Sequence, residues 1–213
     1  MSFGCLVNSS SPLFSLAELV VNSPPVTMSD YWQYSFPPFF TIQPNTETRR
    51  LQMDAWTEII LDYCRRNRIF SLNIGDCLTK APFRNDAISR SLTEESLLTI
   101  LQEMAKRGRI EWVRPEGTSE KKNKNTDGGN RQQECLVFWL KPDEWASTVE
   151  KWVDAKSMAN TICTFYEITD DERADSSLRG LDERILLKAL KILEDKGKAT
   201  IMKMDNSYGV KFL

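Results

Sequence analysis

Histidine is absent from this chain of 213 residues, and its absence removes several functions at once. Without an imidazole base there is no serine or cysteine catalysis of the triad kind, and the common histidine-containing zinc sites are excluded. Chemistry by paired carboxylates or by lysine would still be possible, but no spacing of acids suggests two of them converging in a cleft. We therefore expect a protein that is not an enzyme and that binds no cofactor or metal.

Long apolar runs, paired thiols and a strong charge imbalance are also missing. No uninterrupted apolar stretch approaches the roughly 20 residues of a membrane-spanning helix. The five cysteines include no CxxC pair, and scattered thiols of this kind are typical of a reducing compartment. A formal net charge of -2 provides no overall attraction to nucleic acid or to an anionic membrane. The composition predicts an ordinary cytoplasmic protein.

Basic residues are missing from the first part of the chain, where Arg49 is the first of them. A signal peptide requires a basic n-region and a transit peptide requires arginines, so residues 1–30 fit neither pattern. We interpret this segment as a disordered extension, with Met28 as the start of the native protein. N-terminal sequencing of the native protein would test this.

One helical pattern is written twice, 89 residues apart and without a gap. Residues 92–113 read LTEESLLTILQEMAKRGRIEWV, and residues 181–202 read LDERILLKALKILEDKGKATIM. Thr93 and Asp182 are N-cap types, and Gly108 and Gly197 follow a basic last turn, where a left-handed residue belongs. The two copies share an apolar stripe that predicts one buried helix face: Leu97, Leu98, Leu101 and Met104, matched by Leu186, Leu187, Leu190 and Leu193.

The neighbouring segments correspond as well. Each copy continues as strand, turn and strand, with RIEWV and CLVFWL in the first and KATIMKM and VKFL in the second. Each is preceded by another helix and a strand-like run, IFSLNI or TICTFYEI. The apolar face of the first of these helices comprises Leu51, Ala55, Ile59, Ile60 and Tyr63, and that of the second Trp145, Val149, Trp152 and Val153. The pattern predicts winged helices.

We therefore predict an α+β fold of two tandem winged-helix domains, residues 45–141 and 142–213. They follow the extension at 1–30 and an extended proline and aromatic segment at 31–44. A polar insertion at about 115–134 stands where the first wing should be. The short link between the domains predicts that they sit in a fixed relation.

The segment YWQYSFPPFF, residues 31–40, allows two interpretations. Prolines favour extended backbone, so little order is lost when such a segment binds, and its rings could fill pockets on a partner. Alternatively, the same rings pack on the first domain as an N-terminal strap. The interpretations are compatible, with some rings anchored and others facing outward. Alanine at Phe39 and Phe40 is the substitution expected to separate them.

Duplex DNA binding is the first function to test for a winged helix. The third helix would need exposed basic residues, but the first copy presents three carboxylates and one ammonium. Its exposed positions are Glu94, Glu95, Thr99, Gln102, Glu103 and Lys106. An interaction module is favoured, and a nucleic-acid-binding winged-helix protein is the alternative.

The chain resembles the small tandem winged-helix subunit of the ESCRT-II endosomal sorting complex, from residue 31 to residue 213. The resemblance rests on WQYSFPPFFTIQPN, FWLKPDEWASTVEKWV, TFYE, GLDERILLKAL and the terminal GVKFL, in that order. It implies a non-catalytic subunit, present in two copies per complex, that sorts ubiquitinated cargo into multivesicular bodies. It also implies a cytoplasmic protein that reaches the endosomal membrane through its partners.

The resemblance implies two binding surfaces. The proline and aromatic segment would dock on the two larger ESCRT-II subunits through Trp32, Tyr34, Phe36, Pro37, Pro38, Phe39 and Phe40. The second winged helix would recruit and nucleate an ESCRT-III subunit, with Thr164, Phe165, Tyr166, Glu167, Asp170, Asp171 and Lys188 as candidate contacts. Acidic side chains at 170–175 would steer the basic helices of ESCRT-III proteins.

Overall fold

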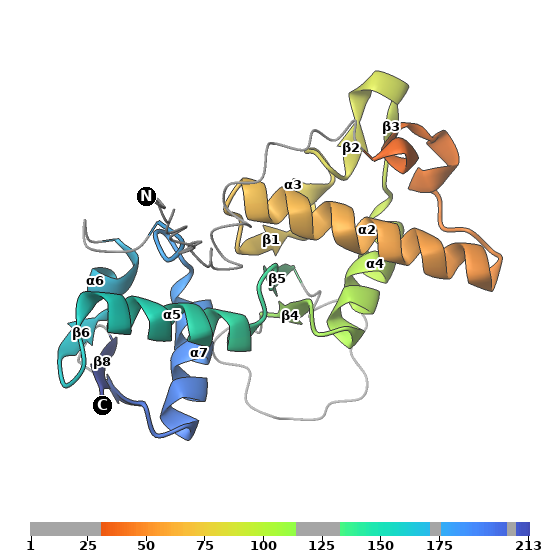
Figure 1. Ribbon diagram of the computed structural model, residues 1–213. Helices are drawn as coiled ribbons and strands as arrows, with labels where there is room; N and C mark the ends of the chain where they lie inside the picture. The colour runs from red at the N-terminus through yellow and green to blue at the C-terminus, as the bar shows by residue number, and fades with distance from the viewer. Residues whose placement is uncertain (1–30, 114–132, 171–175, 204–207) are drawn as a thin grey trace, which may run out of the picture.

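The computed structural model describes residues 31–113, 133–170, 176–203 and 208–213, and their elements follow one order twice (Figure 1). The predicted extension at 1–30 and most of the predicted insertion at 115–134 lie outside these ranges. The first group comprises α2 (Thr46–Arg66), β1 (Ser71–Asn73), α3 (Ile74–Cys77), α4 (Glu94–Lys106), β4 (Ile110–Trp112) and β5 (Glu134–Val137). It also has a small hairpin between α3 and α4, formed by β2 (Arg84–Asn85) and β3 (Arg90–Ser91) around the 3₁₀ turn η4 (Asp86–Ile88). The second comprises α5 (Pro142–Lys156), β6 (Ile162–Thr164), α6 (Phe165–Thr169), α7 (Glu183–Asp195), β7 (Ala199–Lys203) and β8 (Tyr208–Phe212).

Each group closes with a three-stranded antiparallel sheet of the same topology. The strand order is β1–β5–β4 in the first sheet and β6–β8–β7 in the second, so the last strand lies in the middle both times. Leu72 lies opposite Cys135 in the first sheet, and Cys163 lies opposite Val210 in the second. Three helices closed by such a sheet form a winged helix. The prediction of two tandem winged helices in an α+β fold is confirmed.

The internal repeat keeps its register in space, because both α4 and α7 use the end signals that the sequence contains. The side chains of Thr93 and Asp182 accept backbone N–H groups of the first turn at 3.2 and 2.9 Å. After each helix a glycine turns the chain, with φ of 65° at Gly108 and 69° at Gly197. Only glycine adopts this left-handed conformation without a steric cost, so each helix ends where predicted.

The run TICTFYEI was predicted as a strand, and that prediction is wrong in its second half. Helix α6 begins at Phe165, directly after β6. The backbone N–H of Thr164 donates to the Glu167 carboxylate at 2.7 Å, and the Glu167 N–H donates to the Thr164 hydroxyl at 3.3 Å. This reciprocal capping box starts a helix even where β-branched and aromatic residues favour a strand.

The buried face of α2 also differs from the predicted one. Leu51 and Ala55 were expected in the core, but Leu51 is 55% exposed and Ala55 is only half-buried. Met53 and Trp56 are buried there instead, with Trp56 fully inaccessible. The reason is that residues 31–40 pack across α2 at Trp56 and so determine which side of the helix is covered.

Two hydrophobic clusters hold the structure together, and they meet at β5. Along this strand Cys135 and Val137 belong to the first cluster, whereas Leu136 belongs to the second. Phe70, whose carbonyl accepts the Val137 N–H, and Phe138, the residue after β5, also pack into the second cluster. Figure 1 shows β4 and β5 between the α2 and α4 pair and the α5 and α7 pair. Residues of β5 therefore contribute to both cores. The fixed relation expected from the short link stays a prediction.

Ion pairs cross the same boundary. Arg184 Nη1 lies 2.9 Å from Glu134 Oε1, and Lys188 Nζ lies 2.9 Å from Glu111 Oε1. Both pairs are partly exposed, so each contributes at most about 1 kcal/mol to stability. Their effect is on orientation, because they hold α7 against the wing strands of the first winged helix.

Arg68 makes a third polar contact between the two halves, from the turn after α2. Its guanidinium donates to the backbone carbonyls of residues 176 and 177 at 3.1 and 3.2 Å, and to that of residue 179. No carboxylate takes part in these bonds. Arg68 therefore holds the segment that leads into α7 through its backbone.

Replacing Arg68 by alanine is expected to speed amide hydrogen exchange in residues 176–180 several-fold while leaving the melting temperature within about 2 °C, because these exposed carbonyls then bond only to water. Exchange followed by mass spectrometry measures this, with Arg90→Ala as the control at another exposed arginine. Unchanged exchange in Arg68→Ala would show that residues 176–180 keep their conformation without the Arg68 hydrogen bonds.

Candidate interaction site

The proline and aromatic segment, residues 31–40, is the structural feature that sets this chain apart from a bare pair of winged helices. It forms two successive 3₁₀ turns, η2 (Trp32–Ser35) and η3 (Pro37–Phe40). Backbone is extended only at Tyr31, Phe36 and Thr41, around these turns, so the expected extended segment is compacted. Proline at the first two positions of η3 leaves no N–H unsatisfied there, which suits the start of a turn.

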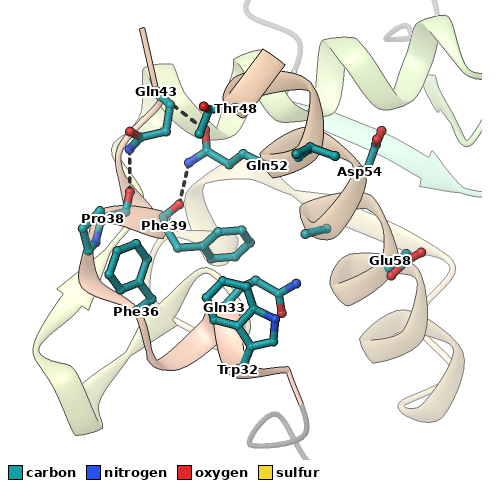
Figure 2. A pocket seen from close by; sticks show the side chains of 12 residues that line it. Trp32, Gln33, Phe36, Pro38, Phe39, Gln43, Thr48, Gln52, Asp54 and Glu58 are labelled. Atoms are coloured by element: carbon teal, nitrogen blue, oxygen red, sulfur yellow. Dashed lines mark hydrogen bonds between the residues drawn. The ribbon is translucent and has the colours of Figure 1, made fainter. Parts of the chain in front are cut away.

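The rings of this segment divide between two sides. Tyr34, Phe39 and Phe40 are buried, as the strap interpretation predicted. Phe39 stacks on the Trp56 ring of α2 with centroids 4.6 Å apart. Trp32 and Phe36 face outward and are 71% and 51% exposed, and Figure 2 shows both rings beside the hollow described below. The prolines Pro37 and Pro38 are exposed at the turn between the two sets of rings.

Hydrogen bonds from buried side chains fix the strap to the first winged helix. Gln52 Nε2 donates to the carbonyls of Phe39 and Thr41 at 2.8 and 2.9 Å, and Trp56 Nε1 donates to the Phe39 carbonyl at 3.2 Å. Asn85 Nδ2 donates to the Tyr34 carbonyl at 2.8 Å. Sequence reasoning missed both amides. Gln52 lies on a face of α2 that was not predicted to be buried, and Asn85 lies on the short strand β2 (Arg84–Asn85), so no local pattern marked either of them.

Two tyrosine hydroxyls add anchors at the start of the strap. Tyr31 donates to the Asp62 carboxylate at 3.0 Å, and Tyr34 donates to the Arg84 carbonyl at 2.9 Å. Burial raises the pKa of both hydroxyls to about 12, and the nearby Asp62 carboxylate contributes to the shift of Tyr31. Both groups therefore stay protonated, as donors, across the neutral range.

These raised pKa values predict a loss of stability at high pH. The folded state holds both protons more tightly than the unfolded chain, whose tyrosine pKa is 10.0, so the stabilisation is complete below pH 10 and disappears as pH approaches 12. In urea unfolding between pH 9 and 12, the wild type is expected to lose more stability than the double variant Tyr31→Phe, Tyr34→Phe. The control is Tyr166→Phe, at an exposed ring. Parallel curves for wild type and double variant would contradict this assignment.

A hollow of about 480 Å³ opens between the strap and α2. Its apolar lining comes from Trp32 and Phe36 on one side and from Leu51 and Ala55 on the other. Asp54 and Glu58 of α2 are also among the residues that line it, and both are labelled in Figure 2. We call this feature the strap groove.

The second predicted surface is formed mainly by α6. Thr164 and Glu167 make the capping box, and Phe165 is buried, with its ring stacked on that of Tyr208 at 5.4 Å. Tyr166 points outward and is 66% exposed. Of this surface, the binding candidates with exposed side chains are therefore Tyr166 and Asp170.

Two further candidates do not join this group. Asp171 lies outside the described residues, as does most of the predicted acidic loop at 170–175. Lys188 is placed on α7 with its ammonium paired to Glu111 of the first winged helix. It thus has a role in the boundary between the two halves, which no sequence pattern indicated.

Catalytic and metal-binding groups can be assessed within the described ranges. There, no group of three or more Cys, Asp or Glu side chains is placed to hold a metal ion. Cys64, Cys77, Cys135 and Cys163 are buried, and burial raises the pKa of Cys77 and Cys135 to about 12. Such thiols are poor nucleophiles at neutral pH. Within the same ranges, no helix is both long and apolar enough to cross a bilayer.

Two winged helices whose hydrophobic cores meet at β5, preceded by a strap that packs on the first of them, define a tandem winged-helix protein. Comparisons with known proteins identify the family. The family described as "ESCRT-II complex subunit" matches residues 33–182. Vacuolar protein-sorting-associated protein 25 of Xenopus laevis is 38% identical over 182 residues, 85% of this chain and 96% of that protein. Its counterpart in Dictyostelium discoideum is 39% identical, covering 84% of this chain and 93% of that protein.

Solved structures agree with these sequence relationships. The crystal structure of subunit VPS25 of the endosomal trafficking complex ESCRT-II aligns with a TM-score of 0.72 at 29% identity, covering 89% of this chain and 98% of that one. A chain of the endosomal ESCRT-II complex (VPS22/VPS25/VPS36) aligns with a TM-score of 0.69 over the same shares of both chains. The chain belongs to the ESCRT-II complex subunit family, with vacuolar protein-sorting-associated protein 25 as its matched relative.

Proposed function

We propose that this chain is a non-enzymatic subunit of an ESCRT-II complex. It docks on the two larger subunits through residues 31–40 and links them to an ESCRT-III subunit, whose assembly it nucleates in the sorting of ubiquitinated cargo into multivesicular bodies. Two copies join each complex. The chain works in the cytoplasm and reaches the endosomal membrane through its partners, without direct contact with lipid or nucleic acid.

The observation that carries the docking proposal is the exposure of Trp32 and Phe36 on a rigid base. Tryptophan and aromatic side chains dominate binding hot spots, and these two project from a strap whose other rings are buried. Because the strap is already ordered by Trp56 and Gln52, binding costs little conformational entropy. The relative named VPS25 stands in a solved complex with VPS22 and VPS36, which supports the same assembly for this chain.

Co-expression of the chain with the two larger ESCRT-II subunits, followed by size-exclusion chromatography, tests the proposal. A single complex containing all three is expected, with a mass that fits two copies of this chain. The larger subunits eluting together without this chain would contradict it. Light scattering on the same peak measures the copy number.

For the ESCRT-III contact we propose the outward face of α6, with Tyr166 as its central residue. An aromatic ring that is 66% exposed beside the acidic Asp170 suits a basic helix with apolar side chains. Tyr166→Ala should weaken binding of a purified ESCRT-III subunit about tenfold or more without changing assembly with the larger ESCRT-II subunits. Equal binding by variant and wild type would exclude α6 as the contact.

Nucleic-acid binding, the alternative function, finds little support in the placed side chains. The exposed face of α4 forms an acidic hollow lined by Glu94, Glu95 and Gln102 among others. On α7 the basic side chains of Arg184 and Lys188 are paired with acids of the first winged helix. A gel-shift assay at low and moderate salt should therefore show no specific duplex binding.

A further inference from the structure

We propose that the strap groove receives an apolar side chain flanked by a basic residue from one of the larger ESCRT-II subunits. This rests on the proposed docking function and deepens it. In the docking proposal the rings of this chain enter pockets on the partner. Here the partner also inserts a side chain into this chain, and α2 provides half of the receiving surface.

The apolar walls of the groove come from two elements, the strap and helix α2. Trp32 and Phe36, with ring centroids 6.4 Å apart, form the wall on the strap. Leu51, 55% exposed, and Ala55 form the wall on α2. A single exposed leucine is ordinary, but one that shares a groove with two exposed aromatic rings makes a continuous apolar surface. Its volume of about 480 Å³ has room for a large aliphatic or aromatic side chain.

The side chains at the base of the groove are fixed by contacts within this chain. Phe39 forms part of its lining but is fixed by its stack on Trp56. Gln52 also lines it, with its amide bonded to two strap carbonyls. The strap therefore does not need to move for the groove to admit a side chain, and its surface is preorganised.

Charge at the rim selects the partner's flanking residue. Asp54 is already paired with Arg50 and Arg107, at 3.2 and 2.6 Å. Glu58 is exposed and has no ion pair among the described residues, so its charge is left for a partner. A carboxylate without a cation beside an apolar groove is complementary to an apolar side chain next to lysine or arginine.

The test uses the full chain and an immobilised subcomplex of the two larger ESCRT-II subunits, with kinetics recorded at several salt concentrations. Leu51→Ala is expected to weaken binding about five- to tenfold, mainly through the dissociation rate. Glu58→Gln is expected to lower the association rate about two- to threefold and to reduce its salt dependence. Matched controls are Ile162→Ala, at a side chain that is 54% exposed, and Glu95→Gln on α4, both of which should bind as the wild type does.

The outcomes separate this inference from the docking function. If Leu51→Ala and Glu58→Gln bind normally while the double variant Trp32→Ala, Phe36→Ala binds weakly, the groove proposal is wrong and docking stands. If all these variants bind normally, both are wrong. If removal of residues 1–27 strengthens binding in the wild type but not in Leu51→Ala, the chain's own N-terminus occupies the groove and the proposal is overturned. Thermal melting confirms that each variant is folded.

Discussion

Alanine at Phe40 or at Phe39 is expected to destabilise the first winged helix by about 3–5 kcal/mol. Phe40 is 3% exposed and meets the Trp56 ring edge-on with centroids 5.4 Å apart, while Phe39 stacks on the same indole. Either substitution removes a buried ring and leaves a cavity against a side chain that cannot collapse into it. The melting temperature should fall by about 10 °C or more, and the double variant should fail to fold stably.

Differential scanning calorimetry measures this, and Phe36→Ala is the matched control in the same strap. Phe36 is half-exposed, so its replacement should change stability by no more than about 0.5 kcal/mol. A wild-type melting temperature for Phe40→Ala would mean that the strap is not part of the folded core. Burial of Phe39 and Phe40 favours the strap interpretation for these two rings, and a large fall in the melting temperature of their alanine variants would support it.

The double variant Trp32→Ala, Phe36→Ala is expected to remain as stable as the wild type and to lose binding to the two larger ESCRT-II subunits by about 100-fold or more. Removing a hot-spot aromatic ring of this kind costs about 2 kcal/mol or more of binding free energy, which corresponds to roughly 30-fold in the dissociation constant. Because the rings are neighbours, their effects will not add fully. Isothermal titration calorimetry with the purified subcomplex measures the affinity.

Tyr166→Ala is the control for this second result, since it removes an exposed aromatic ring of similar size from the other winged helix. It should bind the subcomplex with wild-type affinity. Wild-type affinity in the strap double variant would place the docking surface elsewhere. A lowered melting temperature in that variant would instead show that Trp32 or Phe36 supports the fold.

Local sequence signals were sufficient for much of the architecture. The 89-residue repeat predicted where α4 and α7 begin and end, with Thr93 and Asp182 as caps and Gly108 and Gly197 as stops, because caps and left-handed glycines act within a few residues. The absence of histidine and the family resemblance likewise follow from residue identities alone. The capping box that starts α6 is also present in the sequence TFYE, as Thr164 and Glu167. The strand prediction there gave more weight to β-propensity than to this helix-start signal.

Tertiary structure decided which apolar residues are inside. Periodicity predicts an apolar face of α2 that includes Leu51. In the structure Leu51 is exposed and Trp56 is buried, because the strap, more than ten residues away in sequence, covers only the Trp56 side. The same packing divides the strap into buried Phe39 and exposed Phe36, and it turns Lys188 toward Glu111. These outcomes depend on contacts between elements far apart in the chain. A local pattern of side chains does not determine which distant element will pack against it.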